Sequence, residues 1–196
     1  LRTMRSDNAE EISQITGLIL AGGAGRRVGH RDKGLLPWAG KPLIAHVCSR
    51  IRPQVSALII SCNRNRATYL KYASTTVTDG RTDFQGPLAG IEAALPEIET
   101  EYLLVVTCDM PQLPKDLASR LRGTMLANPA LDACYAHDGE RAQYLCTLIR
   151  HASLQTLPAF LDAGERAVHR WYLAKQVAEV DFSDCREAFR NLNEGD

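Results

Sequence analysis

A glycine-rich, basic segment early in the chain contains the residue types that bind phosphate. Gly22, Gly23 and Gly25 directly follow an apolar run at residues 15–20, and exposed backbone N–H groups in such a loop can surround phosphate oxygens. Four cations lie within the eight residues that follow: Arg26, Arg27, Arg31 and Lys33. The segment matches neither the Walker A loop nor the GxGxxG dinucleotide fingerprint. A surface turn with solvated charges therefore stays an alternative to phosphate binding.

An acidic residue follows the most apolar stretch of the chain. Asp109 comes directly after the run at 102–107 and Cys108, where a carboxylate is costly unless it is paired or binds a ligand. Mg²⁺ prefers one or two carboxylates together with substrate phosphates and water. A role as the cap of the helix expected near Pro114 fails on spacing. Asp109 is therefore the candidate metal ligand.

Residues suited to binding a nucleotide also lie at the end of one predicted strand and at the start of one predicted helix. Asp79 follows the run at 75–78, and its carboxylate can accept hydrogen bonds from the N1–H and N2–H₂ groups of guanine, a donor pattern that adenine lacks. An Asx turn in residues 79–81 is the alternative. Gly86 and Pro87 begin a helical segment with small residues that permit close approach, and an ordinary proline-led helix start is the alternative.

The elements that must position these residues alternate between apolar runs and helical patterns. Strands are expected at residues 15–20, 56–61, 75–78, 102–107, 131–136, 145–149 and 176–182. Helices are expected at 42–51, 64–72, 88–95 and 114–127, and a helical segment interrupted near Gly164 is expected at 150–175. This alternation is typical of an α/β protein with a single-domain, doubly wound, mostly parallel sheet of the Rossmann-like kind. Right-handed crossovers then place the loops after residues 20, 61, 78 and 107 along one edge of the sheet, where open α/β sheets bind ligands.

Length and composition indicate one ordinary soluble domain. The chain has 196 residues, of which 45% are hydrophobic and 23% charged, and we expect a flexible N-terminal segment at 1–14 followed by one domain at 15–196. Basic and acidic residues number 23 each, which argues against a general binder of nucleic acid or anionic membranes. No apolar run has the roughly 18–20 residues of a membrane span, and the N-terminus lacks an apolar signal core. The six cysteines form no metal-type pattern, so we expect free thiols and a cytoplasmic protein.

The motif around the first loop resembles a known family. LILAGGAGRRVGHRDKGLLPWAGKPLIAHV at 18–47 is similar to the LAGGxSxRMGxxK signature of the nucleoside-triphosphate transferases, and within them to the MobA family of molybdenum cofactor guanylyltransferases. Further matches follow in order: DFQGPLAGI at 83–91, VTCDMPQLPKDL at 106–117, AEVDFSD at 178–184 and FRNLN at 189–193. The last two point to the guanylyltransferases specifically. Val28 stands in place of the usual Met, and Tyr144 in place of a common Pro.

The resemblance implies a role for each candidate residue. It implies nucleotide contact along the first loop, with Lys33 on the phosphates and Arg27 nearby as catalytic cations, and Mg²⁺ on Asp109. Lys33 would stabilise charge on the leaving pyrophosphate, so its loss is expected to lower turnover more than nucleotide affinity. The other residues that the resemblance places at nucleotide or acceptor are Leu20, Ala21, Gly22, Gly23, Ser61, Asp79, Gly86, Pro87, Asn191 and Asn193.

Two of these assignments keep an alternative. Ser61 stands where the family often has an Asn that contacts the base, and the hydrogen bond can instead be routed through Asn63. Asn191 and Asn193 match asparagines linked to the molybdopterin acceptor, and on a strand end both amides would share one face. A surface turn is the alternative for the asparagines.

The activity that the resemblance implies is GMP transfer from GTP to the phosphate of molybdenum-bound molybdopterin, which yields molybdopterin guanine dinucleotide and pyrophosphate. Mg²⁺ is the implied cofactor, and GTP and molybdopterin are the substrates. We expect a monomer that contacts molybdoenzymes or cofactor-insertion proteins transiently and binds neither nucleic acid nor membrane. The alternatives are a cytidylyltransferase on the same pterin, a sugar-phosphate nucleotidyltransferase, and a non-catalytic nucleotide or cofactor carrier.

Overall fold

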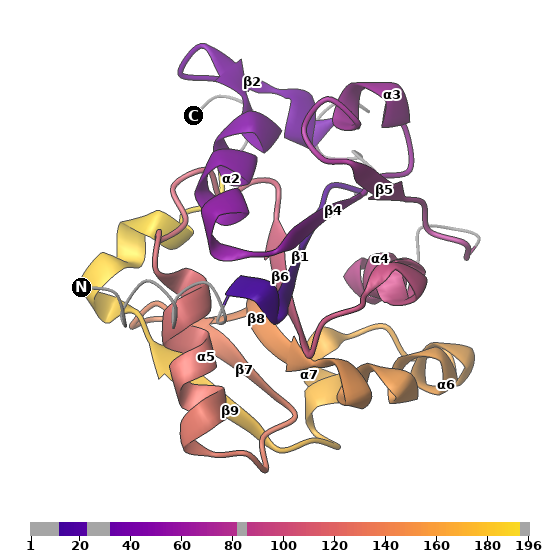
Figure 1. Cartoon of the computed structure of the whole chain (residues 1–196), viewed down its shortest axis with the longest axis vertical. Helices are drawn as coiled ribbons and strands as arrows, with labels where there is room; N and C mark the ends of the chain where they lie inside the picture. The colour runs from indigo at the N-terminus through magenta and orange to yellow at the C-terminus, as the bar shows by residue number, and fades with distance from the viewer. Residues whose placement is uncertain (1–11, 23–31, 82–85, 193–196) are drawn as a thin grey trace.

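One mixed sheet organises the protein (Figure 1). The computed structural model describes residues 12–22, 32–81 and 86–192, and within these ranges seven strands form a sheet of order β5-β4-β1-β6-β8-β7-β9. The strands are β1 (Ile15–Leu20), β4 (Ala57–Ser61), β5 (Thr75–Val77), β6 (Tyr102–Thr107), β7 (Ala133–His137), β8 (Ala142–Arg150) and β9 (Val177–Asp181). A separate hairpin pairs β2 (Pro37–Trp38) with β3 (Lys41–Pro42).

The strand directions confirm the predicted mostly parallel sheet. Strands β5, β4, β1 and β6 are parallel neighbours, and β7 is parallel to β9. Strand β8 is antiparallel to both β6 and β7. Strands β7 and β8 are joined by the short turn at 138–141, and a connection of this length permits only an antiparallel pair.

Helices cover both faces of the sheet. Most buried residues of α2 (Leu43–Ile51) and those of α3 (Arg66–Tyr69) and α5 (Leu117–Ala127) belong to one core cluster. Those of α4 (Pro87–Ala94), α6 (Leu157–Asp162) and α7 (Val168–Tyr172) belong to the other. Figure 1 shows α2 and α5 on one side of the sheet and α4 and α6 on the other. Short 3-10 helices connect these elements: η2 (Lys33–Leu35), η3 (Arg52–Gln54), η4 (Leu95–Glu97), η5 (His151–Thr156) and η6 (Ser183–Phe189).

Strand β6 shows why the sheet needs helices on both sides. Leu104 and Val106 belong to the cluster under α2 and α5, whereas Leu103 and Val105 belong to the cluster under α4 and α6. Successive side chains of a strand point to opposite faces, and all four of these side chains are fully buried. The apolar sequence YLLVVT is therefore explained by burial on both faces.

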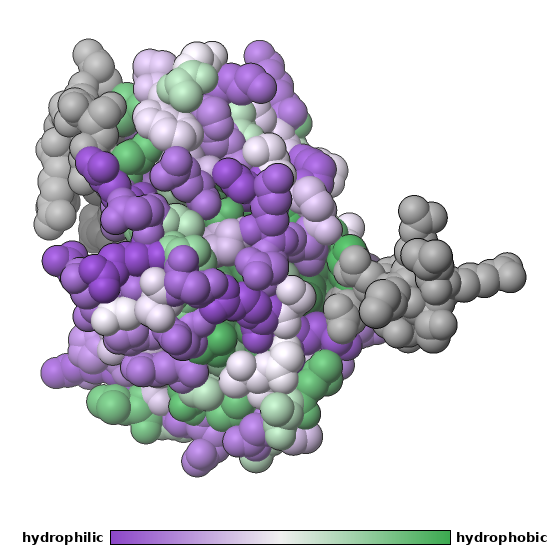
Figure 2. All heavy atoms as spheres, turned by 90° about the vertical axis from the view of Figure 1, so that its left-hand side faces the viewer, coloured by the Kyte–Doolittle hydropathy of each residue, from purple (hydrophilic) through white to green (hydrophobic). Residues whose placement is uncertain are grey.

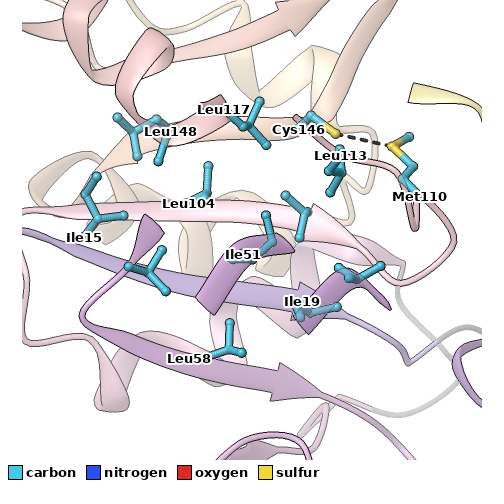
Figure 3. Close-up of a cluster of buried hydrophobic side chains, with 14 of the residues drawn as sticks. Ile15, Ile19, Ile51, Leu58, Leu104, Met110, Leu113, Leu117, Cys146 and Leu148 are labelled. Atoms are coloured by element: carbon cyan, nitrogen blue, oxygen red, sulfur yellow. Dashed lines mark hydrogen bonds between the residues drawn. The ribbon is translucent and has the colours of Figure 1, made fainter. Parts of the chain in front are cut away.

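The larger core includes Met110, which directly follows Asp109 in the chain (Figure 3). Met110 is 4% exposed, and the Sγ atom of Cys146 lies 3.4 Å from its Sδ atom. Leu104, Leu113 and Leu117 pack in the same cluster. This packing anchors the residue that directly follows Asp109. All six cysteines are free thiols, as expected.

Several predicted elements differ from the structure. The strand expected at 145–149 runs over β8, and the helical segment expected at 150–175 forms η5, α6 and α7. The helix expected at 64–72 is regular only over α3, because the N–H groups of Lys71 and Tyr72 bond three residues back, as in a 3-10 turn. The helix expected from Pro114 begins at Leu117. The strand end expected at Asn191 is wrong: η6 ends at Phe189, and residues 190–192 have no regular structure. Asn193, expected on the same strand end, lies outside the described residues.

A buried glutamine explains where α5 begins. The Gln54 Nε2 atom donates to the carbonyl of Pro114 at 2.9 Å, and its Oε1 atom accepts from the N–H of Ala118 at 2.9 Å. The first N–H groups of a helix have no partner within the helix. Gln54, which comes from η3, therefore supplies this partner from a distant part of the sequence.

The outer surface over α2 and α5 is mostly hydrophilic, with only small hydrophobic areas (Figure 2). These helices thus bury their apolar residues against the sheet and present polar residues on this side. Within the described ranges, none of the helices combines the length and the apolar character that crossing a membrane requires.

Candidate active site

The loops that follow four parallel strands meet at one edge of the sheet. The N–H of Ala21 donates to the carbonyl of Ser61 at 2.8 Å, and the N–H of Cys62 donates to the carbonyl of Val77 at 2.9 Å. The N–H of Cys108 donates to the carbonyl of Leu20 at 3.1 Å. The predicted convergence of the loops after β1, β4, β5 and β6 is confirmed.

Lys33 and Asp109 form an ion pair at this edge. The Lys33 Nζ atom lies 2.8 Å from Asp109 Oδ2, and the two side chains are 27% and 17% exposed. The Thr107 hydroxyl donates to Asp109 Oδ1 at 2.5 Å. A cation from the first loop and a carboxylate from the end of β6 thus share one partly buried position, although 76 residues separate them in the chain.

The neighbouring thiol does not supply a nucleophile. Burial, followed by the nearby charge of Asp109, raises the pKa of Cys108 well above the usual range of a thiol. The thiolate is the reactive form of cysteine, so a thiol held protonated is inert. This leaves the ion pair of Lys33 and Asp109 as the charged groups described at this position.

Asn63 connects the first loop to the loop after β5. Its Nδ2 atom donates to the carbonyl of Gly22 at 3.2 Å, and its Oδ1 atom accepts from the N–H of Asp79 at 3.0 Å. Asp79 Oδ1 in turn accepts from the N–H of Arg81 at 2.9 Å, which is the Asx turn considered above as the alternative. This turn uses one carboxylate oxygen of Asp79 and orients the side chain.

The side chain of Ser61 is buried rather than open to solvent. It is 2% exposed, and a Cβ atom added to Gly90 of α4 would lie 2.7 Å from its Oγ atom. Asn63, two residues further on, is only half-buried. Of the two positions considered for a hydrogen bond to the base, the geometry therefore favours Asn63.

Arg81 ties the loop after β5 to two helices. Its guanidinium donates to both carboxylate oxygens of Glu92 at 2.6 Å and pairs with Asp162 at 2.9 Å. Gly86 has φ +82 and precedes Pro87 at the start of α4, a backbone conformation that glycine adopts without strain. The proline-led helix start considered above is thus observed at Pro87.

The C-terminal segment reaches the loop that carries Asp109. The N–H of Leu192 donates to the carbonyl of Asp109 at 2.9 Å, so Asn191 directly precedes a residue bound to this loop. Further back, the guanidinium of Arg120 lies 3.8 Å from the ring centroid of Phe182 and pairs with Asp184 at 3.0 Å. The AEVDFSD motif therefore fastens the C-terminal segment to α5.

Sequence reasoning missed several residues that position segments around this site: Gln54 and Arg120, described above, and the pair Asp32 and Tyr69, in which the Tyr69 hydroxyl donates to the Asp32 carboxylate at 2.5 Å. Each acts through a partner far away in the chain, which no local spacing indicates. Three predicted site residues lie outside the described part of the chain: Gly23, Arg27 and Asn193.

The donor set at Asp109 suits a metal ion that arrives with the substrate. In the ranges that the structure describes, no group of three or more His, Cys, Asp or Glu side chains could hold a metal. A divalent ion at Asp109 would therefore need phosphate oxygens and water for its other ligands. This is the coordination that Mg²⁺ prefers.

A doubly wound sheet with a lysine and a carboxylate at the carboxyl ends of its strands is compatible with the class of α/β nucleotidyltransferases, and the comparison with known families assigns the chain to that class. A family model described as "MobA-like NTP transferase domain" matches residues 17–178. The chain belongs to the MobA-like NTP transferase family.

Curated relatives and a solved structure agree with this assignment. The chain is 43% identical over 180 residues to a protein of Shewanella sp. (strain MR-4) named "Molybdenum cofactor guanylyltransferase", covering 92% of this chain and 91% of that protein. It is 42% identical to the protein of the same name from Shewanella amazonensis, over 92% of this chain and 91% of the relative. The crystal structure of molybdopterin-guanine dinucleotide biosynthesis protein A from Archaeoglobus fulgidus superposes with a TM-score of 0.73 at 21% identity, covering 92% of this chain and 93% of the other. At that identity the structural match supports the fold.

Proposed function

We propose that this protein transfers GMP from GTP to the terminal phosphate of molybdenum-bound molybdopterin, forming molybdopterin guanine dinucleotide and releasing pyrophosphate. The curated relatives of this name match nearly the whole chain. The observation that carries the proposal is the 2.8 Å contact between Lys33 and Asp109 at the sheet edge. This contact joins the phosphate-binding cation and the metal-binding carboxylate that the reaction requires.

The reaction is an in-line attack by an acceptor phosphate oxygen on the α-phosphorus of GTP, with loss of pyrophosphate. Such transfers depend mainly on positioning and on neutralisation of charge. The backbone at Leu20, Ala21 and Gly22 binds the nucleotide. Lys33 leaves Asp109 and neutralises the charge that develops on the leaving pyrophosphate. Mg²⁺, when bound with the triphosphate at Asp109, supplies further neutralisation of phosphate charge.

Selection of guanine rests on Asp79 in this proposal. Its carboxylate accepts from N1–H and N2–H₂ of guanine, and neither adenine nor cytosine offers this pair of donors. Asn191 binds the pterin acceptor, and the hydrogen bond of Leu192 to Asp109 places it next to the Asp109 loop. We propose further that the protein acts as a cytoplasmic monomer and passes its product to molybdoenzymes or cofactor-insertion proteins through transient contacts.

The decisive experiment measures transfer of labelled GMP. Purified protein is incubated with labelled GTP, Mg²⁺ and molybdopterin bound to an intact acceptor protein, and the labelled dinucleotide product is quantified. CTP, ATP and UTP in excess should fail to compete. Absence of transfer with a demonstrably intact acceptor would reject the proposal, and competition by CTP would instead support the cytidylyltransferase alternative.

The variant Asp109→Asn separates an enzyme from a carrier. The amide keeps the shape of the side chain but removes its charge, so we expect turnover to fall by at least about 100-fold while the protein stays folded. The matched control is Asp116→Asn, which changes an exposed aspartate. Steady-state rates and thermal unfolding are measured for both variants. A non-catalytic carrier would keep its biological role in the Asp109 variant.

A further inference from the structure

Asp32, the residue before Lys33, directs its carboxylate away from the helix that it precedes. Asp32 occupies the N-cap position of η2, yet its carboxylate makes no cap hydrogen bond to that helix, although aspartate is among the preferred N-cap residues. Its Oδ1 atom instead accepts from the hydroxyl of Tyr69 at 2.5 Å, and its Oδ2 atom accepts from Asn65 Nδ2 at 3.0 Å. Both carboxylate oxygens are therefore bound to the segment that contains α3.

The partner segment shows the same departure. Asn65 occupies the N-cap position of α3 in the left-handed conformation, with φ 54, and its side chain does not cap α3. Two N-cap side chains, Asp32 and Asn65, thus bond to each other rather than to the helices that they precede. This arrangement joins the two short helices into one unit.

Tyr69 is a rigid base for this unit. Its side chain is fully buried in the core, and α3 is fastened to β5 because Arg66 Nε donates to Thr76 Oγ1 at 2.8 Å. Burial, followed by the hydrogen bond to Asp32, raises the pKa of Tyr69 above the usual range of a phenol. The hydroxyl accordingly keeps its proton and donates to Asp32.

Gly34 provides the space that the tyrosine hydroxyl needs. A Cβ atom added at Gly34 would lie 2.5 Å from Tyr69 Oη, closer than real Cβ contacts. The backbone of η2 at Gly34 therefore packs directly against the hydroxyl of Tyr69. The lysine lies between a residue bonded to Tyr69 and a residue packed on it.

We propose that Tyr69 is a positioning residue for Lys33, acting through Asp32 to hold η2 so that the lysine ammonium faces Asp109. The hydroxyl of Tyr69 donates to Asp32, whereas the ammonium of Lys33 donates to Asp109. Tyr69 restricts the backbone of Lys33, and the 2.8 Å contact between Lys33 and Asp109 is the result. The catalytic consequence of this proposal rests on the proposed function, since Lys33 is placed there on the pyrophosphate.

The first test removes only the hydroxyl, with Tyr69→Phe. We expect kcat to fall about fivefold to tenfold, as for one lost buried hydrogen bond, while KM for GTP changes less than about twofold. The matched control is Tyr172→Phe, which removes a buried hydroxyl that donates to Thr147 Oγ1 at 2.9 Å. This control should lose comparable stability and keep its kcat. Equal losses of kcat in the two variants would overturn the proposal.

A double-mutant cycle asks whether the effect passes through the lysine. In a Lys33→Ala background, Tyr69→Phe should lower kcat no further, because there is no ammonium left to position. Additive losses would contradict the proposal.

A rescue variant tests the hydrogen-bond pattern. The single variant Asp32→Asn places an amide donor opposite Asn65 Nδ2 and should lower kcat. The double variant that also carries Asn65→Asp restores a donor–acceptor pair and should recover kcat to within about twofold of the wild type.

A measurement without turnover separates this proposal from the proposed function. The ¹⁵N-labelled ammonium of Lys33, assigned with Lys33→Arg, should give a resolved NMR signal in the ligand-free protein, since an ion pair slows proton exchange. That signal should be lost in Tyr69→Phe and kept in Tyr172→Phe. If the wild type gave this pattern but transferred no GMP, only the function would be rejected. An unchanged signal in Tyr69→Phe would reject the positioning role.

Discussion

At the scale of single residues, the site depends on side chains that join loops as much as on those proposed to touch the nucleotide. Asn63 uses its donor on Gly22 and its acceptor on Asp79, so one amide sets the separation of the two loops. Thr107 similarly fixes one oxygen of Asp109. The charged residues were predictable from their types. Asn63 was noticed in the sequence only as an alternative contact to the base, and its role in joining two loops became visible from its contacts.

The two-sided role of Asn63 predicts a loss of nucleotide affinity in Asn63→Asp. The substitution replaces the Nδ2 donor by an oxygen that faces the carbonyl of Gly22, so the loops should separate and the Kd for GTP should rise about tenfold. Isothermal titration calorimetry measures the Kd. Asn128→Asp is the control, because Asn128 uses only its acceptor Oδ1, toward the N–H of Ala130 at 3.2 Å. Equal affinity in the wild type and the Asn63 variant would contradict the role given to this amide.

At the scale of elements, the helices differ in how closely they approach the sheet. A Cβ atom at Gly90 of α4 would lie 2.7 Å from Ser61 Oγ and 3.0 Å from Leu20 Cδ2, whereas one at Gly123 of α5 would meet nothing within 4 Å. Helix α4 therefore packs on β1 and β4 at a distance that only glycine permits. Helix α5 carries a glycine that its packing does not require.

The same substitution in these two helices should have opposite effects on stability. Gly123→Ala should raise the free energy of unfolding by about 0.5–1 kcal/mol, because alanine has the higher helix propensity. Gly90→Ala should lower it by about 1–3 kcal/mol through overpacking against Ser61 and Leu20. Urea denaturation at fixed temperature gives both values. A stabilised Gly90 variant would show that α4 can move away from the sheet at little cost.

At the scale of the whole molecule, two buried or partly buried aspartates couple stability to pH. Asp138 Oδ1 accepts from the N–H groups of Glu140 and Arg141 at 2.8 and 2.7 Å, and its Oδ2 atom accepts from Gln143 at 2.6 Å. Burial opposes ionisation, but these hydrogen bonds prevail and lower the pKa of Asp138 below 3.8. The pKa of Asp132 is lowered in the same way, against the effect of burial, by Ser153 and the N–H of Gln176.

A lowered pKa in the folded state gives a definite direction of pH dependence. The stabilisation is fully present above the unfolded pKa, near 3.8, and is lost as the pH falls through the lower pKa of the folded state. We expect the free energy of unfolding, measured by urea denaturation from pH 7 to pH 3, to fall in the acid range. Asp138→Asn should be less stable at pH 7 and should show a shallower acid decline, and the exposed Asp116→Asn should follow the wild type. An acid decline as steep in Asp138→Asn as in the wild type would exclude this carboxylate as a source.

Much of the fold and the outline of the site could be inferred from the residue pattern. The apolar runs that became β1, β4 and β6 were recognisable because a strand buried on both faces is rich in apolar side chains. The edge strand β5 was recognisable from its β-branched residues. Parallel crossovers have one hand, so placing the loops of Lys33, Asp79 and Asp109 on one edge followed from strand order alone. These are consequences of local composition and general chain geometry.

Contacts between distant segments required the folded chain. Gln54 sets the start of α5, Tyr69 holds Asp32 across 37 residues of sequence, and Leu192 bonds to the Asp109 loop. The burial of Ser61 beneath Gly90 likewise depends on how closely α4 approaches the sheet. Such hydrogen bonds and close approaches depend on the separation of elements to within about an ångström. No periodicity or motif encodes that separation, because it arises only when all the elements pack together.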